Sequence, residues 1–280
     1  MTMRRCEFCD SPVPADATIC PVCKETIAEE TLERILPILK RPESPEVKFM
    51  GTRERMWGVI RKPGATYRDI GQRPDGAGPF VIILINALIV AGLFLSLSSK
   101  VTTNVIVNTT TFEIGQTNLL TSPQGGMVWI VALVGIMSNL MVGLIYLLVG
   151  TIFAHFAFKI TGGTGGKMKT LSIVGYSMMP VILVRLVAIL VILIGMPAYP
   201  DIVDFFDGGA LALITPAVIN WAYTSGIWFA IDVMTTGAFL WTGYLLIFGI
   251  REAHDTSTLW AALVAIACVI VLVWTFWQVH

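Results

Sequence analysis

Four of the five cysteines form two close pairs near the start of the chain, Cys6 with Cys9 and Cys20 with Cys23, and ten residues separate the pairs. Each CxxC turn presents two thiolates, and two such turns close a tetrahedral four-thiolate shell. A redox dithiol needs only one CxxC, so the second pair favours metal binding. The spacing predicts one structural zinc ion, because a fully thiolate shell leaves no open position for an activated water.

Two charged residues, Arg185 and Asp232, fall inside long apolar runs. A charge inside a bilayer is costly and marks either a paired or a functional position. The predicted depths of the two residues differ by only about 6 Å, so we predict that they form an intramembrane pair. A structural pair is favoured over a transport site, because a proton or ion relay needs more polar groups than these runs offer.

The sequence gives no sign of an enzyme. No set of nucleophile, base and oxyanion donors is visible, so no catalytic residues are predicted. Residues 1–40 contain five basic and seven acidic side chains, which argues against nucleic-acid binding. The glycine-rich stretch 162–166 before Lys167 is one residue short of a phosphate-binding loop and is followed by Met168, so no nucleotide cofactor is predicted.

These residues must be positioned by membrane-spanning helices. Hydrophobic residues make up 55% of the chain and charged residues 14%, against roughly 25% charged in soluble domains. A crossing needs ~20 apolar residues, and five runs reach that length. The predicted fold class is therefore an all-α polytopic membrane protein with five transmembrane helices and a small N-terminal zinc-ribbon. The predicted spans are about 80–97, 127–158, 171–195, 226–250 and 259–279.

Four regions are predicted along the chain. Residues 1–27 form the zinc-ribbon, 28–52 a short helix (Ala28–Leu36) and linker, 53–79 a basic juxtamembrane segment, and 80–280 the membrane domain. The basic segment is interpreted as an interfacial helix whose Lys and Arg face anionic lipids; a soluble helix that docks on the ribbon is the alternative.

The composition of two shorter segments between the spans also predicts local structure. Residues 208–222 are short and contain Pro216, and they are interpreted as an interfacial or re-entrant piece. The Val- and Thr-rich stretch 101–112 favours a small β-hairpin.

Charge placement predicts the orientation. Of the 19 Lys and Arg residues, 13 precede Phe80, and Lys159, Lys167, Lys169 and Arg251 follow the second and fourth spans. Lys100 is the one basic residue in the opposite loops. The positive-inside rule therefore predicts a cytosolic N-terminus and an external C-terminus. Thiolate zinc ligands also persist better in a reducing cytosol.

Small residues and one proline predict close helix packing. Pro180 lacks an amide hydrogen and should kink the third span near the carbonyl of Tyr176, while Gly175 allows a neighbouring helix to approach. Gly135, Gly143 and Gly150 recur near one face of the second span, where helix contact is the default interpretation. His155 is expected near the inner end of that span, at the membrane interface.

Two motifs resemble the signatures of the Yip (Ypt-interacting protein) membrane family. Asp75, Gly78 and Pro79 match DLxGP, with Gly76 in place of the leucine, and Gly175, Tyr176 and Pro180 match GYxxxP. The resemblance runs from about Trp57 to the C-terminus and implies five spans with the N-terminus inside. The first 27 residues resemble a prokaryote-type zinc-ribbon, in which Asp10 and Lys24 replace the usual glycines.

The resemblance implies a membrane-organising or trafficking role, with small Rab-type GTPases as partners of the eukaryotic relatives. We interpret the chain as a non-enzymatic membrane scaffold or adaptor whose zinc-ribbon docks cytosolic partners. The expected surroundings are the lipid bilayer, anionic lipids at the basic segment, a cytosolic protein such as a small GTPase, and further copies in an oligomer. The alternative hypothesis is a small transporter or channel that uses the Arg185 and Asp232 region.

Overall fold

The computed structural model describes residues 3–6, 9, 11–14, 20–24, 49–108, 112–160, 165–203, 211–254 and 256–279. The short helix predicted over Ala28–Leu36 lies outside these residues. The chain forms two compact units. The first comprises Met1–Phe80, Leu147–Met179 and Leu240–Leu272, and the second comprises Val81–Tyr146, Pro180–Phe239 and Val273–His280.

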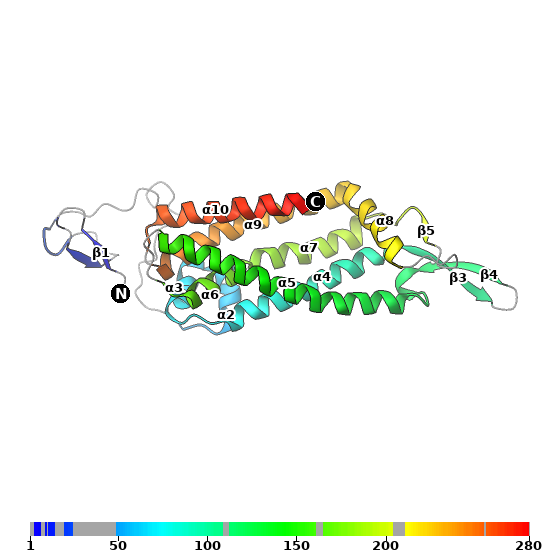
Figure 1. Ribbon diagram of the computed structural model, residues 1–280, viewed down its shortest axis with the longest axis horizontal. Coiled ribbons are helices and arrows are strands. Elements are labelled where there is room, and N and C mark those ends of the chain that lie inside the picture. Colours follow the sequence, from blue (N-terminus) through cyan, green and yellow to red (C-terminus); the bar gives the residue numbers. More distant parts are fainter. Residues whose placement is uncertain are drawn as a thin grey trace. The chain divides into compact units, whose positions relative to one another are not determined.

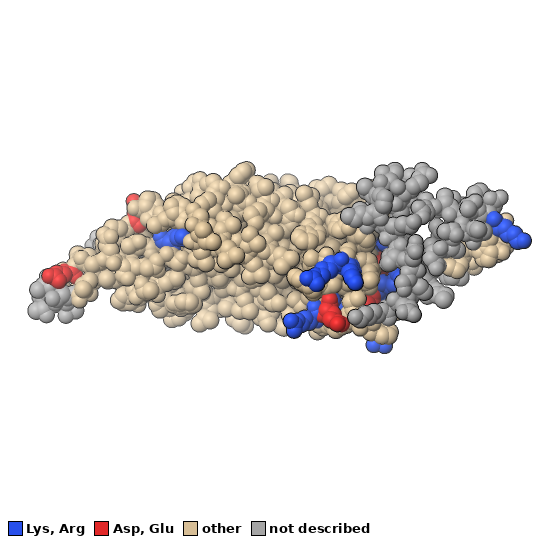
Figure 2. All heavy atoms as spheres, turned by 180° about the vertical axis from the view of Figure 1, so that it is seen from behind, with Lys and Arg blue, Asp and Glu red and all other residues tan. Residues whose placement is uncertain are grey.

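In the part of the chain that the structure describes, five helical segments are long and apolar enough to cross a membrane, which confirms the predicted fold class. On the face shown in Figure 2, a broad band of the surface carries no Lys, Arg, Asp or Glu, as expected of a surface in contact with lipid tails. The helices are labelled in Figure 1. They are Ala77–Ser98 (α4), Gly125–Ile160 (α5), Lys167–Ser177 and Met179–Gly195 (α6 and α7, one span), Gly226–His254 (α9) and Thr258–Val279 (α10).

Within the described residues of the first unit, two short helices precede the spans: Thr52–Arg61 (α2) and Pro63–Gln72 (α3). The Glu54 carboxylate accepts a hydrogen bond from the Gly51 amide at 3.2 Å and so caps α2. Pro63 ends α2 and begins α3, because proline cannot donate a backbone hydrogen bond but suits the first helical position. Both helices pack against α6. We call residues Thr52–Gln72 the α2–α3 platform.

The second unit contains the predicted β-hairpin. Strands Thr102–Asn108 (β3) and Glu113–Asn118 (β4) pair in antiparallel register, and Ile202–Val203 (β5) adds a short parallel strand in the order β4-β3-β5. A 3-10 turn, Leu119–Thr121 (η2), leads from β4 towards α5. The helix Leu211–Thr224 (α8) has 14 residues and falls short of a crossing. A buried apolar cluster joins η2, β5 and α8 to the helices α4, α5, α7 and α9. Its members are Leu97, Val101, Leu119, Val128, Ala188, Ile192, Met196, Val203, Val218, Ala222 and Ile231.

The predicted contact face of α5 is present in part. A Cβ at Gly143 would lie 2.6 Å from Ile83 of α4, and a Cβ at Gly150 would lie 3.8 Å from Val174 of α6. A Cβ at Gly135 would meet no neighbouring helix within 4 Å among the described residues. Helix contact therefore explains Gly143 and Gly150. The 36 residues of α5 extend over about 54 Å, more than the ~30 Å hydrocarbon core requires.

Candidate functional site

The four paired cysteines come together in the first unit. Strands Met3–Arg5 (β1) and Pro12–Pro14 (β2) pair antiparallel and place Cys6 and Cys9 at their turn. The four Sγ atoms lie within 4.8 Å of one another, with Cys6 and Cys23 at 3.6 Å and Cys9 and Cys20 at 3.7 Å. A tetrahedral shell with metal–sulfur bonds of about 2.3 Å requires sulfur separations of about 3.8 Å. The cluster can therefore hold a metal ion.

Local hydrogen bonds favour the thiolate form of Cys9. Ser11 lowers the pKa of the Cys9 thiol to about 6 through hydrogen bonds from its side chain and backbone, which favours the thiolate needed for metal binding. Lys24 stands where the resemblance places glycine and has a φ of 61°, in the left-handed region that favours glycine. The second CxxC turn therefore adopts this conformation with a residue less suited to it than glycine.

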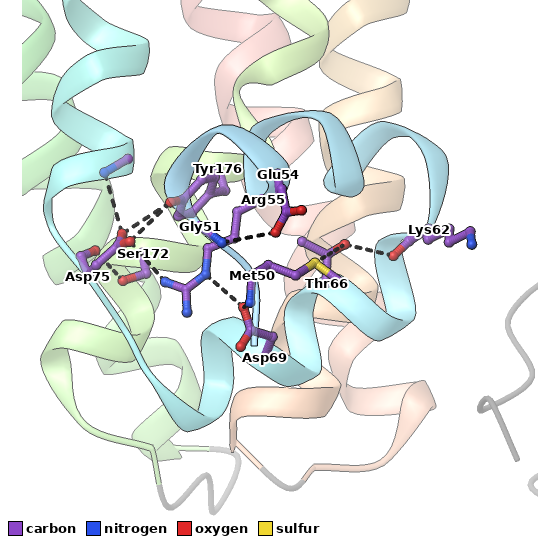
Figure 3. A network of polar contacts seen from close by, with 11 residues as sticks. Met50, Gly51, Glu54, Arg55, Lys62, Thr66, Asp69, Asp75, Ser172 and Tyr176 are labelled. Atoms are coloured by element: carbon purple, nitrogen blue, oxygen red, sulfur yellow. Dashed lines mark hydrogen bonds and ion pairs between the residues drawn. The ribbon is translucent and has the colours of Figure 1, made fainter. Parts of the chain in front are cut away.

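The α2–α3 platform contains a buried arginine, Arg55, which Figure 3 shows between two carboxylates. Its Nε donates to Asp69 Oδ2 at 2.7 Å and its Nη1 donates to Asp75 Oδ2 at 2.8 Å. Burial lowers the pKa of Arg55, but the hydrogen bond and charge of Asp69 outweigh this effect and raise it. The prediction that the basic residues of this segment face lipid headgroups is therefore wrong for Arg55.

The two sequence motifs meet beside this arginine (Figure 3). Tyr176 Oη donates to the carboxylate of Asp75 at 3.2 Å, and the hydroxyl of Ser172 donates to the backbone carbonyl of Asp75. The Gly78 amide also donates to Asp75 Oδ1 at 3.4 Å. Asp75 thus accepts hydrogen bonds from α2, from its own turn and from α6. We call this contact, with the glycines and proline described next, the motif junction.

Glycine is required on both sides of the motif junction. A Cβ at Gly78 would lie 2.0 Å from Tyr176 Oη, and a Cβ at Gly175 would lie 2.4 Å from the Cβ of Pro79. Either methyl group would overlap its neighbour, because real Cβ contacts are about 3.4 Å or more. Gly78 and Pro79 of the first motif and Gly175 and Tyr176 of the second thus bring the start of α4 against α6.

Pro180 lies at the second position of α7. The helix is interrupted at Met178, between the end of α6 at Ser177 and the start of α7 at Met179. The predicted kink is therefore present as a break in the helix. The hydroxyl of Ser177 shares a hydrogen bond with the buried Tyr67 of α3, and burial raises the pKa of Tyr67.

A second ionic contact of the platform was not expected from the sequence. Arg68 of α3 donates to Glu252 of α9 at 3.3 Å, and Arg251 donates to the same carboxylate at 3.2 Å. The side chain of Arg251 is fully buried and also reaches Thr258 at 3.4 Å. The one signal in the sequence was the presence of Arg251 and Glu252 at the end of a span, where charges commonly pair.

The structure gives the intramembrane arginine a hydrogen-bond partner on α4. Arg185 of α7 donates to Asn86 Oδ1 of α4, and Asp232 of α9 is buried with 7% of its surface exposed. Asn86 was overlooked because an amide inside an apolar run gives a weaker signal than a charge. The pairing of Arg185 with Asp232 stays a prediction.

The helices, the motif junction and the cysteine cluster together define a polytopic membrane protein with a small metal-binding head. The family model of the Yip1 domain matches residues 57–278. The chain therefore belongs to the Yip1 domain family. No curated protein and no solved structure matches it.

Proposed function

We propose that this Yip-type protein is a non-enzymatic membrane scaffold or adaptor that presents its α2–α3 platform and its zinc-ribbon to cytosolic partners. The motif junction carries this proposal. Residues shared with the family position a pair of surface helices on the ends of the spans by close packing and buried ion pairs, and no described residue of the junction is arranged as a nucleophile with a base. Such an arrangement is better suited to presenting α2 and α3 to a binding partner than to catalysis.

The proposed orientation places the platform and the head, residues 1–27, in the cytosol and the C-terminus outside. The exposed side chains Arg53, Arg61, Lys62 and Arg73 lie on or beside the platform, and Lys159 and Lys167 lie at the ends of α5 and α6 that belong to the same unit. The positive-inside rule favours the cytosol for that end. Five crossings then bring the C-terminus to the other side.

The head is proposed to bind one structural zinc ion through Cys6, Cys9, Cys20 and Cys23. All four positions of a tetrahedral ion are then thiolates, so the ion stabilises the head and activates no water. Metal binding supplies much of the folding free energy of such small modules. The folded head is the proposed docking module for a cytosolic protein, of which a small GTPase is the example that the family resemblance supplies.

The exposed face of α2 is proposed to contact anionic lipids. Trp57 is 49% exposed, and the Arg61 guanidinium stacks over its ring at 4.7 Å. Arg53, Trp57 and Arg61 follow at four-residue intervals and share one side of the helix. Each basic residue near an anionic surface contributes about 1 kcal/mol, and tryptophan favours the headgroup region.

The adaptor proposal is tested by recovering partners from native membranes with the full chain and with a variant that lacks residues 1–27. Loss of a specific cytosolic partner on deletion of the head, with the membrane domain still inserted, supports the proposal. The same partners with and without the head would refute the docking role. A solute or proton flux in liposomes that disappears in Asp232→Asn would support the alternative, a transporter that uses the Arg185 and Asp232 region.

A further inference from the structure

Two of the three histidines meet at one threonine in the first unit. His155 Nδ1 of α5 and His254 Nε2 of α9 each lie 3.2 Å from Thr170 Oγ1 of α6. His254 is 1% exposed, and the ring of Phe158 packs against it with centroids 4.3 Å apart. The other nitrogen of His254, Nδ1, is buried and has no hydrogen-bond partner among the described residues.

This arrangement suits neutral imidazoles. A threonine hydroxyl can donate one hydrogen bond and accept another, so it can join two neutral rings, one as acceptor and the other as donor. A second proton on His254 would place an N–H on both ring nitrogens. The Nδ1–H would then be buried without an acceptor among the described residues, and the ring would carry a poorly solvated charge.

The groups around His254 also disfavour its protonation. Burial lowers the pKa of His254 to about 4, and the charges of His155, Lys169 and Lys159 act in the same direction. These residues come from α5 and α6, the helices packed against the ring. On its own helix, the Glu252 carboxylate accepts hydrogen bonds from Arg68 and Arg251. The counter-ion that a charged His254 needs is thus already paired.

Thr170 links this cluster to the motif junction. It lies in the first turn of α6, the helix whose Ser172 and Tyr176 bind Asp75. We propose that His155, Thr170 and His254 form a proton-responsive latch that holds the first turn of α6 between α5 and α9 while the ring of His254 is neutral. Protonation releases that turn and loosens the α2–α3 platform. The latch itself is independent of the proposed scaffold function, and only its effect on partner docking rests on that function.

The latch is tested by amide hydrogen exchange on the full chain in lipid nanodiscs at about pH 7.5 and about pH 5, corrected for the intrinsic pH dependence of exchange. We expect the first turn of α6 and the platform to exchange faster at the lower pH by a factor on the order of ten. His254→Gln, which keeps a hydrogen-bonding group but cannot titrate, should abolish the difference. His280→Gln removes the third histidine of the chain and should behave as the wild type.

Equal exchange at the two pH values in the wild type would overturn the latch, and so would an equal acceleration in His254→Gln. If His254→Gln does not fold, the titration of isotope-labelled histidines in the wild type replaces it. The proposal requires that ring protonation and accelerated exchange share one midpoint. Midpoints that differ by more than about one pH unit would contradict it. Loss of partner recovery with an intact latch would instead count against the scaffold function alone.

Discussion

Replacing Arg55 with alanine should be among the most damaging single changes in the α2–α3 platform. The side chain of Asp69 is 0% exposed, and its Oδ1 has no hydrogen-bond partner among the described residues. Without Arg55, the described contact left to this carboxylate is the Met50 amide at 3.3 Å. Leaving a buried charge without its partner costs about 3 to 5 kcal/mol. The Asp75 contact adds at most about 1 kcal/mol, because that side chain is 27% exposed and water screens it.

A double-mutant cycle on thermal unfolding in detergent measures these contributions separately. The coupling of Arg55→Ala with Asp69→Asn should be at least about 2 kcal/mol, and the coupling with Asp75→Asn about 1 kcal/mol or less. Arg61→Ala is the matched control, because this exposed arginine stacks on Trp57 and its loss should cost less than about 1 kcal/mol. Equal effects of the Arg55 and Arg61 substitutions would refute the reasoning.

Three further predictions concern the glycine contact, the metal and the intramembrane arginine. Gly78→Ala places a methyl group 2.0 Å from a tyrosine oxygen and should cost about 1 to 3 kcal/mol of thermal stability, whereas Gly76→Ala, with open space around its Cβ, should be nearly neutral. Metal analysis should return about one zinc per chain. Chelation should unfold the head while the membrane helices remain folded. A folded, reduced head without zinc would contradict the proposed zinc site. Cycles of Arg185→Met with Asn86→Leu and with Asp232→Asn should both show coupling above about 0.5 kcal/mol if the arginine bridges α4 and α9, and additive effects in the second cycle would limit its partner to Asn86.

The apolar helices and the metal cluster could be predicted because their signals are local. A span is visible as a run of apolar residues, and two CxxC turns hold their ligands at fixed spacing wherever the chain goes next. The hairpin at β3 and β4 was equally visible as a Val- and Thr-rich stretch.

The contacts of the motifs could not be predicted in the same way. Asp75 and Tyr176 are 101 residues apart, and nothing in either motif alone says that one is the partner of the other. Arg55 resembles its basic neighbours in sequence, although it is buried. Its distinguishing signal was the presence of Asp69 and Asp75 in a segment otherwise rich in Lys and Arg.

The central claim is that the motif junction holds the α2–α3 platform on the ends of the spans. Amide hydrogen exchange of Thr52–Gln72 in Asp75→Ala, in lipid nanodiscs at constant pH, tests it most directly. Asp75 accepts hydrogen bonds from Arg55 and Tyr176. The partly exposed contact with Arg55 contributes at most about 1 kcal/mol, and the hydrogen bond from the Tyr176 hydroxyl to the charged carboxylate contributes about 1.5 to 3 kcal/mol. The account predicts exchange at least about tenfold faster across the platform, with α10 unchanged. Unchanged exchange in the platform would contradict the account, because α2 and α3 would then hold their place without the motif.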